Sequence, residues 1–189
     1  MGGLEDDGIV RCGWANGSEM MRVYHDEEWG SPVVDEQAMF ERLSLEAFQA
    51  GLSWATILRK RPAFREAFCD FDLEYCAGLG DADVEELMDN PEIIRARAKI
   101  EATRSNAAAA IELREDGGLV ALIGSFAPAK SPEPTSHAEV PTSSDESAAL
   151  AKELRARGFK FVGPTNMYAL MEAVGLVNTH LLSCFRRNA

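Results

Sequence analysis

The chain has 189 residues, of which 46% are hydrophobic and 26% charged, an ordinary composition for a globular protein with its own core. No apolar run approaches the ~20 residues of a membrane-spanning helix, and the acidic start MGGLEDDGIV lacks the features of a signal peptide. We therefore expect a cytoplasmic protein without a membrane partner, whose cysteines are ligands or buried thiols. The formal net charge of −12 argues against a protein that attracts nucleic acid by its overall charge.

Capping residues and apolar spacing predict helices through the first half of the chain, after an acidic tail at residues 1–10. Asp35 is a suitable N-cap for a helix that Gly51 interrupts, and Ser53 can cap the following segment, WATILRKR. Pro62 fits the first turn of a further helix. Two more short helices are predicted to follow the caps Asp72 and Asp81.

The second half contains the longest predicted helix, residues 92–114, and one clear interruption. Residues 127–147 are rich in Pro, Ser and Thr and predict an extended surface loop. Helices are predicted after it at 146–157 and from about Thr165. No stretch alternates apolar and polar residues over the length of a strand. We therefore expect an all-α domain over residues 11–189, with a division into two lobes as an alternative.

Two pairs of potential metal ligands lie near opposite ends of the chain. His180 and Cys184, in "GLVNTHLLSCFRR", would share one face if this segment is helical. Cys12 and His25 could complete a tetrahedral set of two nitrogens and two sulfurs, which suits zinc and leaves no open position on the metal. By spacing alone, two buried thiols and two surface imidazoles that never meet are an equally good interpretation. Of the remaining cysteines and histidine, we interpret Cys69 and Cys76 as small core residues and His137 as a solvated loop residue.

The segment "LSLEAFQAGLSWATI" places a carboxylate, Glu46, among apolar residues. Burial of this carboxylate would be unfavourable unless it has a partner or a ligand. Trp54 follows a Gly-Leu-Ser turn that could leave Leu52 protruding. Aromatic rings with one carboxylate suit a pocket for a flat cationic ligand, although composition alone favours an aromatic core with a satisfied glutamate. The aromatic residues near the first pair of potential ligands are Trp14, Tyr24 and Trp29.

Five blocks occur in order along the chain: "RCGW", "YHDEEWG", "LEAFQAGLSWATIL", "GFKFVGPT" and "GLVNTH". Together they resemble the DNA-3-methyladenine glycosylase I family, the zinc-containing branch of the helix-hairpin-helix DNA glycosylase superfamily, from about residue 11 to residue 184. The resemblance implies an all-α, helix-hairpin-helix glycosylase-like domain. It also implies that one structural zinc ion clips the termini together, with the ligands Cys12, His25, His180 and Cys184.

The resemblance implies a base-excision-repair enzyme that hydrolyses the N-glycosidic bond of 3-methyladenine in alkylated double-stranded DNA. Methylation at N3 gives this base a positive charge and makes it a good leaving group, so the enzyme must mainly extrude and select it. Free 3-methyladenine would be the product, and we expect the enzyme to act as a monomer. It would be monofunctional, because no lysine is evidently placed to form a Schiff base; the counter-candidate is Lys160.

The resemblance also implies roles for the pocket residues. Glu46 would accept hydrogen bonds from the extruded base and favour its positive charge, and it is the one candidate catalytic carboxylate. Trp54 would stack on the base. Tyr24 and Trp14 would form further walls of the pocket. Gly51 and Leu52 would form the wedge that fills the vacated place in the base stack.

The sequence departs from the family pattern at two places. Pro91-Glu92 occupies the turn of the hairpin, where Pro removes a backbone donor and Glu adds negative charge near phosphate. Thr179 stands before His180 where the family often has an acid, which alters the support of that ligand. Two basic segments could nevertheless face DNA, with the cations Arg59, Lys60, Arg61, Arg65, Arg95, Arg97, Lys99 and Arg104.

Two other functions are weighed against a glycosylase. A zinc-stabilised helical DNA-binding module that has lost turnover would keep this fold, but it would not need Glu46, Tyr24 and Trp54. A zinc hydrolase is disfavoured because four protein ligands leave the metal closed. We therefore interpret the chain as a glycosylase.

Overall fold

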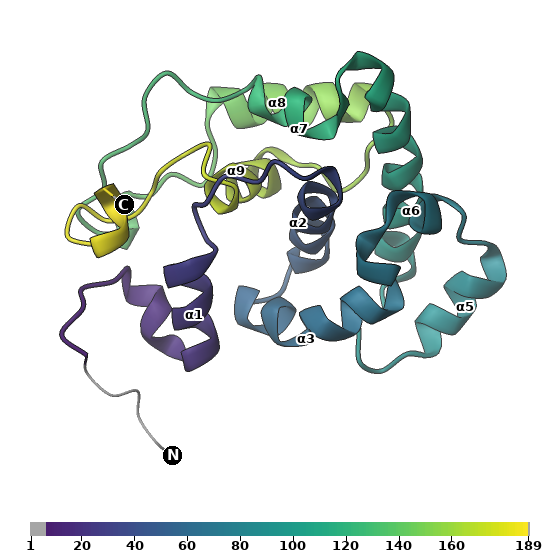
Figure 1. Cartoon of the computed structure of the whole chain (residues 1–189), viewed down its shortest axis with the longest axis horizontal. Helices are drawn as coiled ribbons and strands as arrows, with labels where there is room; N and C mark the ends of the chain where they lie inside the picture. The colour runs from purple at the N-terminus through teal and green to yellow at the C-terminus, as the bar shows by residue number, and fades with distance from the viewer. Residues whose placement is uncertain (1–6, 189) are drawn as a thin grey trace.

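The computed structural model describes residues 7–188, which form helices joined by turns and loops, without a β-strand (Figure 1). The all-α prediction is confirmed for this part of the chain, whereas residues 1–6 of the predicted acidic tail lie outside it. Within the same residues, no helix combines the length and the apolar character needed to cross a membrane. The α-helices are α1 (Glu19–Glu27), α2 (Glu36–Gln49), α3 (Trp54–Ala67), α4 (Leu73–Ala77), α5 (Asp81–Asp89), α6 (Arg97–Glu112), α7 (Gly118–Gly124), α8 (Asp145–Ala156) and α9 (Pro164–Ala173). The 3₁₀ helices are η1 (Gly13–Gly17), η2 (Cys69–Phe71), η3 (Leu113–Asp116), η4 (His137–Glu139) and η5 (Phe185–Asn188).

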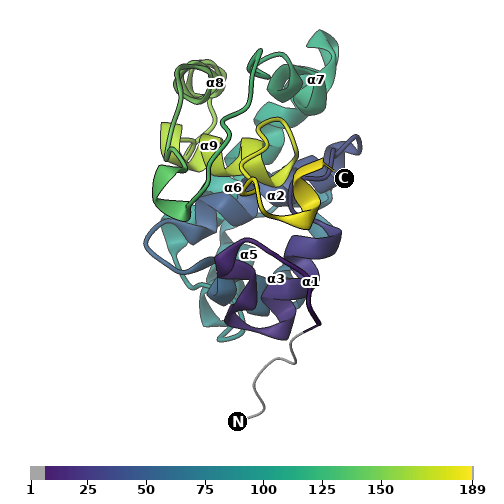
Figure 2. The same cartoon turned by 90° about the vertical axis from the view of Figure 1, so that its left-hand side faces the viewer.

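Helix α2 lies at the centre of the molecule. It packs against α3, α6, α7 and α9, and both views show it in the interior (Figures 1 and 2). Helices α8 and α9 pack together, while α4 and α5 pack on α6. The N-terminal segment and the C-terminal segment lie side by side at one end, where the Phe185 N–H donates to the Val10 carbonyl (Figure 1). This arrangement places α2, α9 and both terminal segments around one region.

The main core is built around fully buried phenylalanine side chains. Their ring centroids lie between 4.6 and 6.4 Å apart, within the range of favourable aromatic pairs. Burial of each such ring stabilises the fold by roughly 1.5–3 kcal/mol. These residues are Phe40, Phe48, Phe64, Phe68 and Phe71. A second, smaller cluster packs beside α1 and consists of Met21, Tyr24 and Leu58 with Trp14, Trp29 and Trp54 around them.

Most of the predicted helix caps are confirmed. The side chains of Asp35, Ser53 and Asp72 each accept a hydrogen bond from a backbone N–H in the first turn of the following helix. The prediction for Asp81 is wrong by one residue, because Gly80 is the N-cap of α5 and Asp81 is its first residue. Local sequence therefore fixes where α2, α3 and α4 begin.

The prediction for Pro62 is wrong. This residue lies inside α3, which continues without a break to Ala67. Proline removes one hydrogen bond from a helix, but its neighbours Arg61 and Phe64 are buried and held by tertiary contacts. Packing therefore overrides the tendency of Pro62 to begin a helix.

The longest helix, α6, begins at Arg97 rather than at residue 92. Residues 90–96 instead form the turn between α5 and α6. Within this turn, the Glu92 N–H donates to Asn90 Oδ1 at 2.9 Å. Helix α7 was not predicted; it follows Gly117, whose φ of +100° lies in the left-handed region that favours glycine.

One expectation for the cysteine residues is wrong. Cys69 is exposed, whereas Cys76 is buried as predicted. Cys69 begins a tight surface turn of left-handed residues, with φ of 50°. The condition that the segment with His180 and Cys184 is helical is not met, because this segment is a turn. Residues 127–147 form the predicted extended loop, interrupted by the short η4, and α8 begins near their end.

Candidate active site and metal centre

The structure brings the two predicted ligand pairs together. The ligand atoms of Cys12, His25, His180 and Cys184 all lie within 4.8 Å of one another, and all four residues are buried. Cys184 Sγ lies 3.4 Å from His25 Nε2 and 3.5 Å from His180 Nδ1, and Cys12 Sγ lies 3.7 Å from His180 Nδ1. Ligand atoms at about 2.0–2.3 Å from a tetrahedral zinc ion are about 3.3–3.8 Å apart. The four donor atoms and these three distances therefore match a closed four-ligand metal site.

Hydrogen bonds behind the cluster hold both imidazoles. His25 Nδ1 lies 2.8 Å from Asp26 Oδ1, and Arg11 Nε donates to both carboxylate oxygens of Asp26. The backbone of Trp29 forms a hydrogen bond with His180. Burial lowers the pKa of both imidazoles, that of His180 to about 4, so both remain neutral as metal ligation requires. These partners fix which nitrogen of each ring faces the cluster.

The cluster joins the two ends of the described chain. Residues 180–184 form a turn in which the Cys184 N–H donates to the Leu181 carbonyl at 2.8 Å. The Leu181 N–H in turn donates to Cys12 Sγ at 3.4 Å. A turn, and not helical periodicity, thus brings His180 and Cys184 to the same point.

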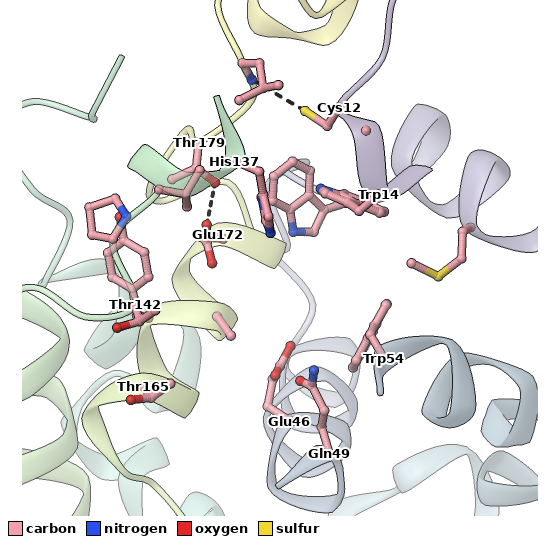
Figure 3. A pocket seen from close by; sticks show the side chains of 18 of the residues that line it. Cys12, Trp14, Glu46, Gln49, Trp54, His137, Thr142, Thr165, Glu172 and Thr179 are labelled. Atoms are coloured by element: carbon pink, nitrogen blue, oxygen red, sulfur yellow. Dashed lines mark hydrogen bonds between the residues drawn. The ribbon is translucent and has the colours of Figure 1, made fainter. Parts of the chain in front are cut away.

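A cavity of about 580 Å³ opens beside the cluster, a volume typical of small-molecule sites (Figure 3). Aromatic rings form one of its walls. The Trp14 ring centroid lies 5.0 Å from that of Trp29 and 6.3 Å from that of Tyr24, and Tyr24 lies 5.3 Å from Trp54. Trp29 also packs edge-on against His180, at 4.5 Å between centroids. The metal-ligand cluster therefore supports the aromatic wall from behind.

Glu46 lines this cavity from α2 (Figure 3). Its side chain is buried, and its Oε2 has no hydrogen-bond partner among the described residues. Burial, followed by the negative charge of Glu172, raises the pKa of Glu46 to about 8, although Arg42 opposes this shift. A buried acceptor without a partner destabilises a fold by about 1–3 kcal/mol. The folded protein thus contains an acceptor that a ligand can satisfy.

Three aromatic residues reach the cavity from different helices. Trp54, the first residue of α3, lines it, and its buried indole Nε1 has no hydrogen-bond partner within residues 7–188. Tyr24 comes from α1, and burial raises its pKa above the usual range, so its hydroxyl stays protonated and can donate. Trp14 comes from η1. Flat rings, hydrogen-bond donors and the acceptor Glu46 therefore surround one space.

The loop between α2 and α3 presents Leu52 to solvent. Gly51 has a φ of +85°, which favours glycine, and Leu52 is 40% exposed. Lys99 Nζ donates to the carbonyl oxygens of Phe48 and Ala50 at the end of α2. A cation at these carbonyls stabilises a helix C-terminus, so Lys99 braces this loop instead of reaching outward.

Glu172 on α9 is a second carboxylate of the cavity, which we did not predict from the sequence. Thr179 Oγ1 donates to Glu172 Oε1 at 2.5 Å (Figure 3). Burial raises the pKa of Glu172 to about 7, while the bond from Thr179 opposes the shift. Glu172 stands in the apolar segment "YALMEAVG", so the signal that singled out Glu46 could also have found it. His137 is exposed, as predicted, but it also lines the cavity from η4.

Most of the cations expected to face DNA form interactions within the molecule. Lys60 Nζ donates to the carbonyl oxygens of Pro91 and Glu92 and so braces the turn between α5 and α6. Of the predicted set, Arg59 and Arg95 are exposed and have no partner in the part of the chain that the structure describes. The other interactions are Arg61 and Arg65 with Glu41, Arg97 with Glu85, Arg104 with Asp81, and Lys99 with the carbonyls of α2.

Comparison with known proteins identifies relatives of this chain. The sequence profile of the family described as methyladenine glycosylase matches residues 14–187. The chain is 43% identical over 179 residues to DNA-3-methyladenine glycosylase 1 of Escherichia coli (strain K12), which covers 93% of this chain and 96% of that protein. It is similar to a crystal structure of 3-methyladenine DNA glycosylase I, with a TM-score of 0.89, 43% identity and coverage of 93% and 98% of the two chains. A variant of 3-methyladenine DNA glycosylase I in complex with 3-methyladenine gives a TM-score of 0.88, 33% identity and coverage of 94% and 97%. The chain belongs to the methyladenine glycosylase family.

Proposed function

We propose that this chain is a monofunctional DNA glycosylase of base-excision repair, which hydrolyses the N-glycosidic bond of 3-methyladenine in alkylated double-stranded DNA. The observation that carries the proposal is the buried Oε2 of Glu46, which has no hydrogen-bond partner among residues 7–188 and lies in a cavity of about 580 Å³ that Trp54 also lines. The complex of a relative with 3-methyladenine supports the same ligand here. Residues 11–189 would form one glycosylase domain. The cytoplasmic location and the monomeric state remain predictions from the sequence.

An extruded base would find complementary groups on each side of this cavity. Trp54 would stack on its face, Tyr24 and Trp14 would form further walls, and Glu46 would accept hydrogen bonds from its amino edge. A buried carboxylate attracts a cation far more strongly than it would in water, so Glu46 would favour methylated over neutral adenine. Because the cationic base is already a good leaving group, extrusion and selective binding would supply most of the catalysis.

We propose that Cys12, His25, His180 and Cys184 hold one structural zinc ion. The buried set of two nitrogens and two sulfurs fits zinc in donor type and spacing. Four protein ligands leave no position for water or substrate, so the ion would stabilise the fold and not take part in hydrolysis. It would hold together the termini and the aromatic wall that rests on His180.

The DNA-binding surface is proposed to include the turn between α5 and α6, as the hairpin, together with Arg59 and Arg95. Pro91 provides no N–H in this turn, and the Glu92 N–H already donates to Asn90, so few backbone donors remain for phosphate. We therefore expect weak binding that is strongest at low salt. Lys160 is exposed and is not among the residues that line the cavity, which supports hydrolysis without a Schiff base.

Leu52 is proposed as the wedge that fills the place of the extruded base. Leu52→Ala is expected to lower kcat/KM for release of 3-methyladenine from methylated duplex DNA about tenfold, a loss of about 1.4 kcal/mol. The affinity for free 3-methyladenine should stay unchanged, because Leu52 is not among the residues that line the cavity. Val34→Ala, at an exposed valine before α2, is the matched control. Equal losses in both measurements would assign Leu52 to the pocket, and unaltered release would exclude a wedge.

Base release from methylated duplex DNA tests the proposed function. The wild-type protein is expected to release free 3-methyladenine, identified by chromatography, and to leave the abasic strand uncleaved. A covalent protein–DNA adduct trapped by borohydride would instead indicate a lysine nucleophile and contradict monofunctional hydrolysis. No release above the spontaneous background, from folded and metal-loaded protein, would favour a DNA-binding module that lacks turnover.

A further inference from the structure

Glu172 is a half-buried carboxylate to which the proposed reaction gives no role. It lies on α9 and points into the same cavity as Glu46 of α2 (Figure 3). The two helices pack directly against each other. Asn166 of α9 donates through Nδ2 to the backbone carbonyl of Glu46 at 3.2 Å, which fixes one helix against the other. Two carboxylates are therefore held in one cavity by neighbouring helices.

Thr179 orients the Glu172 side chain. Thr179 is buried, and its Oγ1 donates to Glu172 Oε1 at 2.5 Å. The other oxygen, Oε2, has no hydrogen-bond partner among residues 7–188, so it remains available to a ligand. Neither Glu172 nor Glu46 forms an ion pair with a described residue. The part of the chain that the structure describes thus supplies no positive partner in contact with either carboxylate.

We propose that Glu172 is a second specificity-determining residue, which together with Glu46 selects a base that carries a positive charge. This inference rests on the proposed function and deepens it. Two carboxylates in one cavity repel each other when both are ionised, and a cation bound between them removes that repulsion. A neutral base of the same shape does not remove this repulsion. The pair of carboxylates therefore distinguishes a cationic base from a neutral base more strongly than Glu46 alone would.

Selection of a cation by this pair should be accompanied by a measurable release of protons. Burial raises the pKa of Glu46 to about 8 and that of Glu172 to about 7, so the empty pair holds protons near neutral pH. A bound cation favours the ionised pair and should release a proton. The other titratable or charged groups near the pair are Tyr24 and Arg42 beside Glu46, Tyr168 on α9 with Glu146 of α8 nearby, and Cys12 and His137 in the cavity wall. Burial keeps the pKa of both tyrosines well above neutral.

Glu172→Gln tests the proposal, because the amide oxygen can still accept from Thr179 while the charge is lost. The probes are 3,9-dimethyladeninium, which carries a fixed positive charge, and neutral 9-methyladenine. Calorimetry at pH 7 in buffers of different ionisation enthalpy measures affinity and proton release together. We expect the variant to bind the cation about tenfold more weakly and to release fewer protons than the wild type, with unchanged affinity for 9-methyladenine. The same titration in a His137→Ala background should preserve the difference.

Four further measurements keep the outcomes distinct. Thr179→Val removes the hydrogen bond but leaves the charge of Glu172, so it should weaken cation binding less than Glu172→Gln. Metal content and thermal unfolding of each variant report any purely structural effect. Equal losses for the cation and for 9-methyladenine, or a lower Tm with unchanged selectivity, would overturn the proposal. Base release by the wild type on methylated DNA is scored separately, so that its failure would reject the glycosylase function while leaving the charge selectivity of the pair measurable.

Discussion

Glu46→Gln is expected to lower kcat/KM for release of 3-methyladenine from methylated duplex DNA by about 100-fold or more. Removal of one partner from a buried, hydrogen-bonded charge pair costs about 2–5 kcal/mol, and every 1.4 kcal/mol is tenfold. Glutamine keeps the shape of the side chain, so the loss would report the missing negative charge and not a change in packing. Single-turnover base release, with chromatographic separation of the freed bases, measures the effect.

The control for this substitution is Glu66→Gln, at an exposed glutamate of α3 that lies outside the cavity. It should leave base release unchanged. Circular dichroism and metal content establish that the Glu46→Gln protein is folded and metal-loaded. A folded variant that releases 3-methyladenine at the wild-type rate would remove Glu46 from the pocket chemistry.

The same substitution should stabilise the folded protein at higher pH. The pKa of Glu46 in the folded state, about 8, lies above its ordinary value of 4.5. Below pH 4.5 the Glu46 carboxyl is protonated in both the folded and the unfolded state, so it does not change the free energy of unfolding. As the pH rises toward 8, the unfolded chain loses this proton while the folded chain retains it, and the free energy of unfolding falls. The gain from Glu46→Gln in thermal unfolding should therefore grow between pH 5 and pH 8, and we expect about 2 kcal/mol at the upper end. A gain that does not depend on pH would contradict this assignment of the proton.

Local sequence was sufficient where a structural feature depends on only one turn of chain. An N-cap such as Asp35 or Ser53 acts on the backbone of the residues that follow it, so its effect can be predicted without knowledge of the fold. The interior position of Pro62 and the late start of α6 depend on contacts that are distant in sequence. One such contact is formed by Lys60 of α3, which donates hydrogen bonds to the turn at residues 90–96. Periodicity cannot reveal such contacts.

The candidate site was predictable to a different degree. The four metal ligands and the main pocket residues were predicted from the family resemblance, because residues so far apart as Cys12 and Cys184 carry no periodic signal. The pair of Glu172 and Thr179 was missed, since its bond forms only after the chain turns back beyond α9. Gly175 allows this turn: its φ is +74°, and a Cβ there would lie 2.6 Å from the Gly30 carbonyl oxygen. The hydrogen bond between Thr179 and Glu172 therefore depends on the reversal of the chain at Gly175, which the residues around each partner do not reveal.

Cys184→Ser is expected to abolish binding of the proposed zinc ion and to lower Tm by roughly 10 °C. Loss of one thiolate opens a site whose other ligands, Cys12, His25 and His180, come from both ends of the chain. Binding of structural zinc can contribute about 10 kcal/mol or more to folding, and a loss of only about 3 kcal/mol corresponds to roughly 10 °C for a chain of this size. Elemental analysis of the purified protein and thermal unfolding measure the two effects, and chelation of metal from the wild type should reproduce both.

Cys69→Ser separates the role of a ligand from the general effect of removing a thiol, because Cys69 is exposed and lies outside the cluster. It should retain full metal content and the wild-type Tm. Since Trp29 packs on His180 and Trp14 on His25, loss of the metal should also loosen the aromatic wall and slow base release in Cys184→Ser alone. Full metal content in Cys184→Ser would refute the proposed ligand set. Metal loss with unchanged Tm and unchanged base release would show instead that packing of the termini holds this wall without the ion.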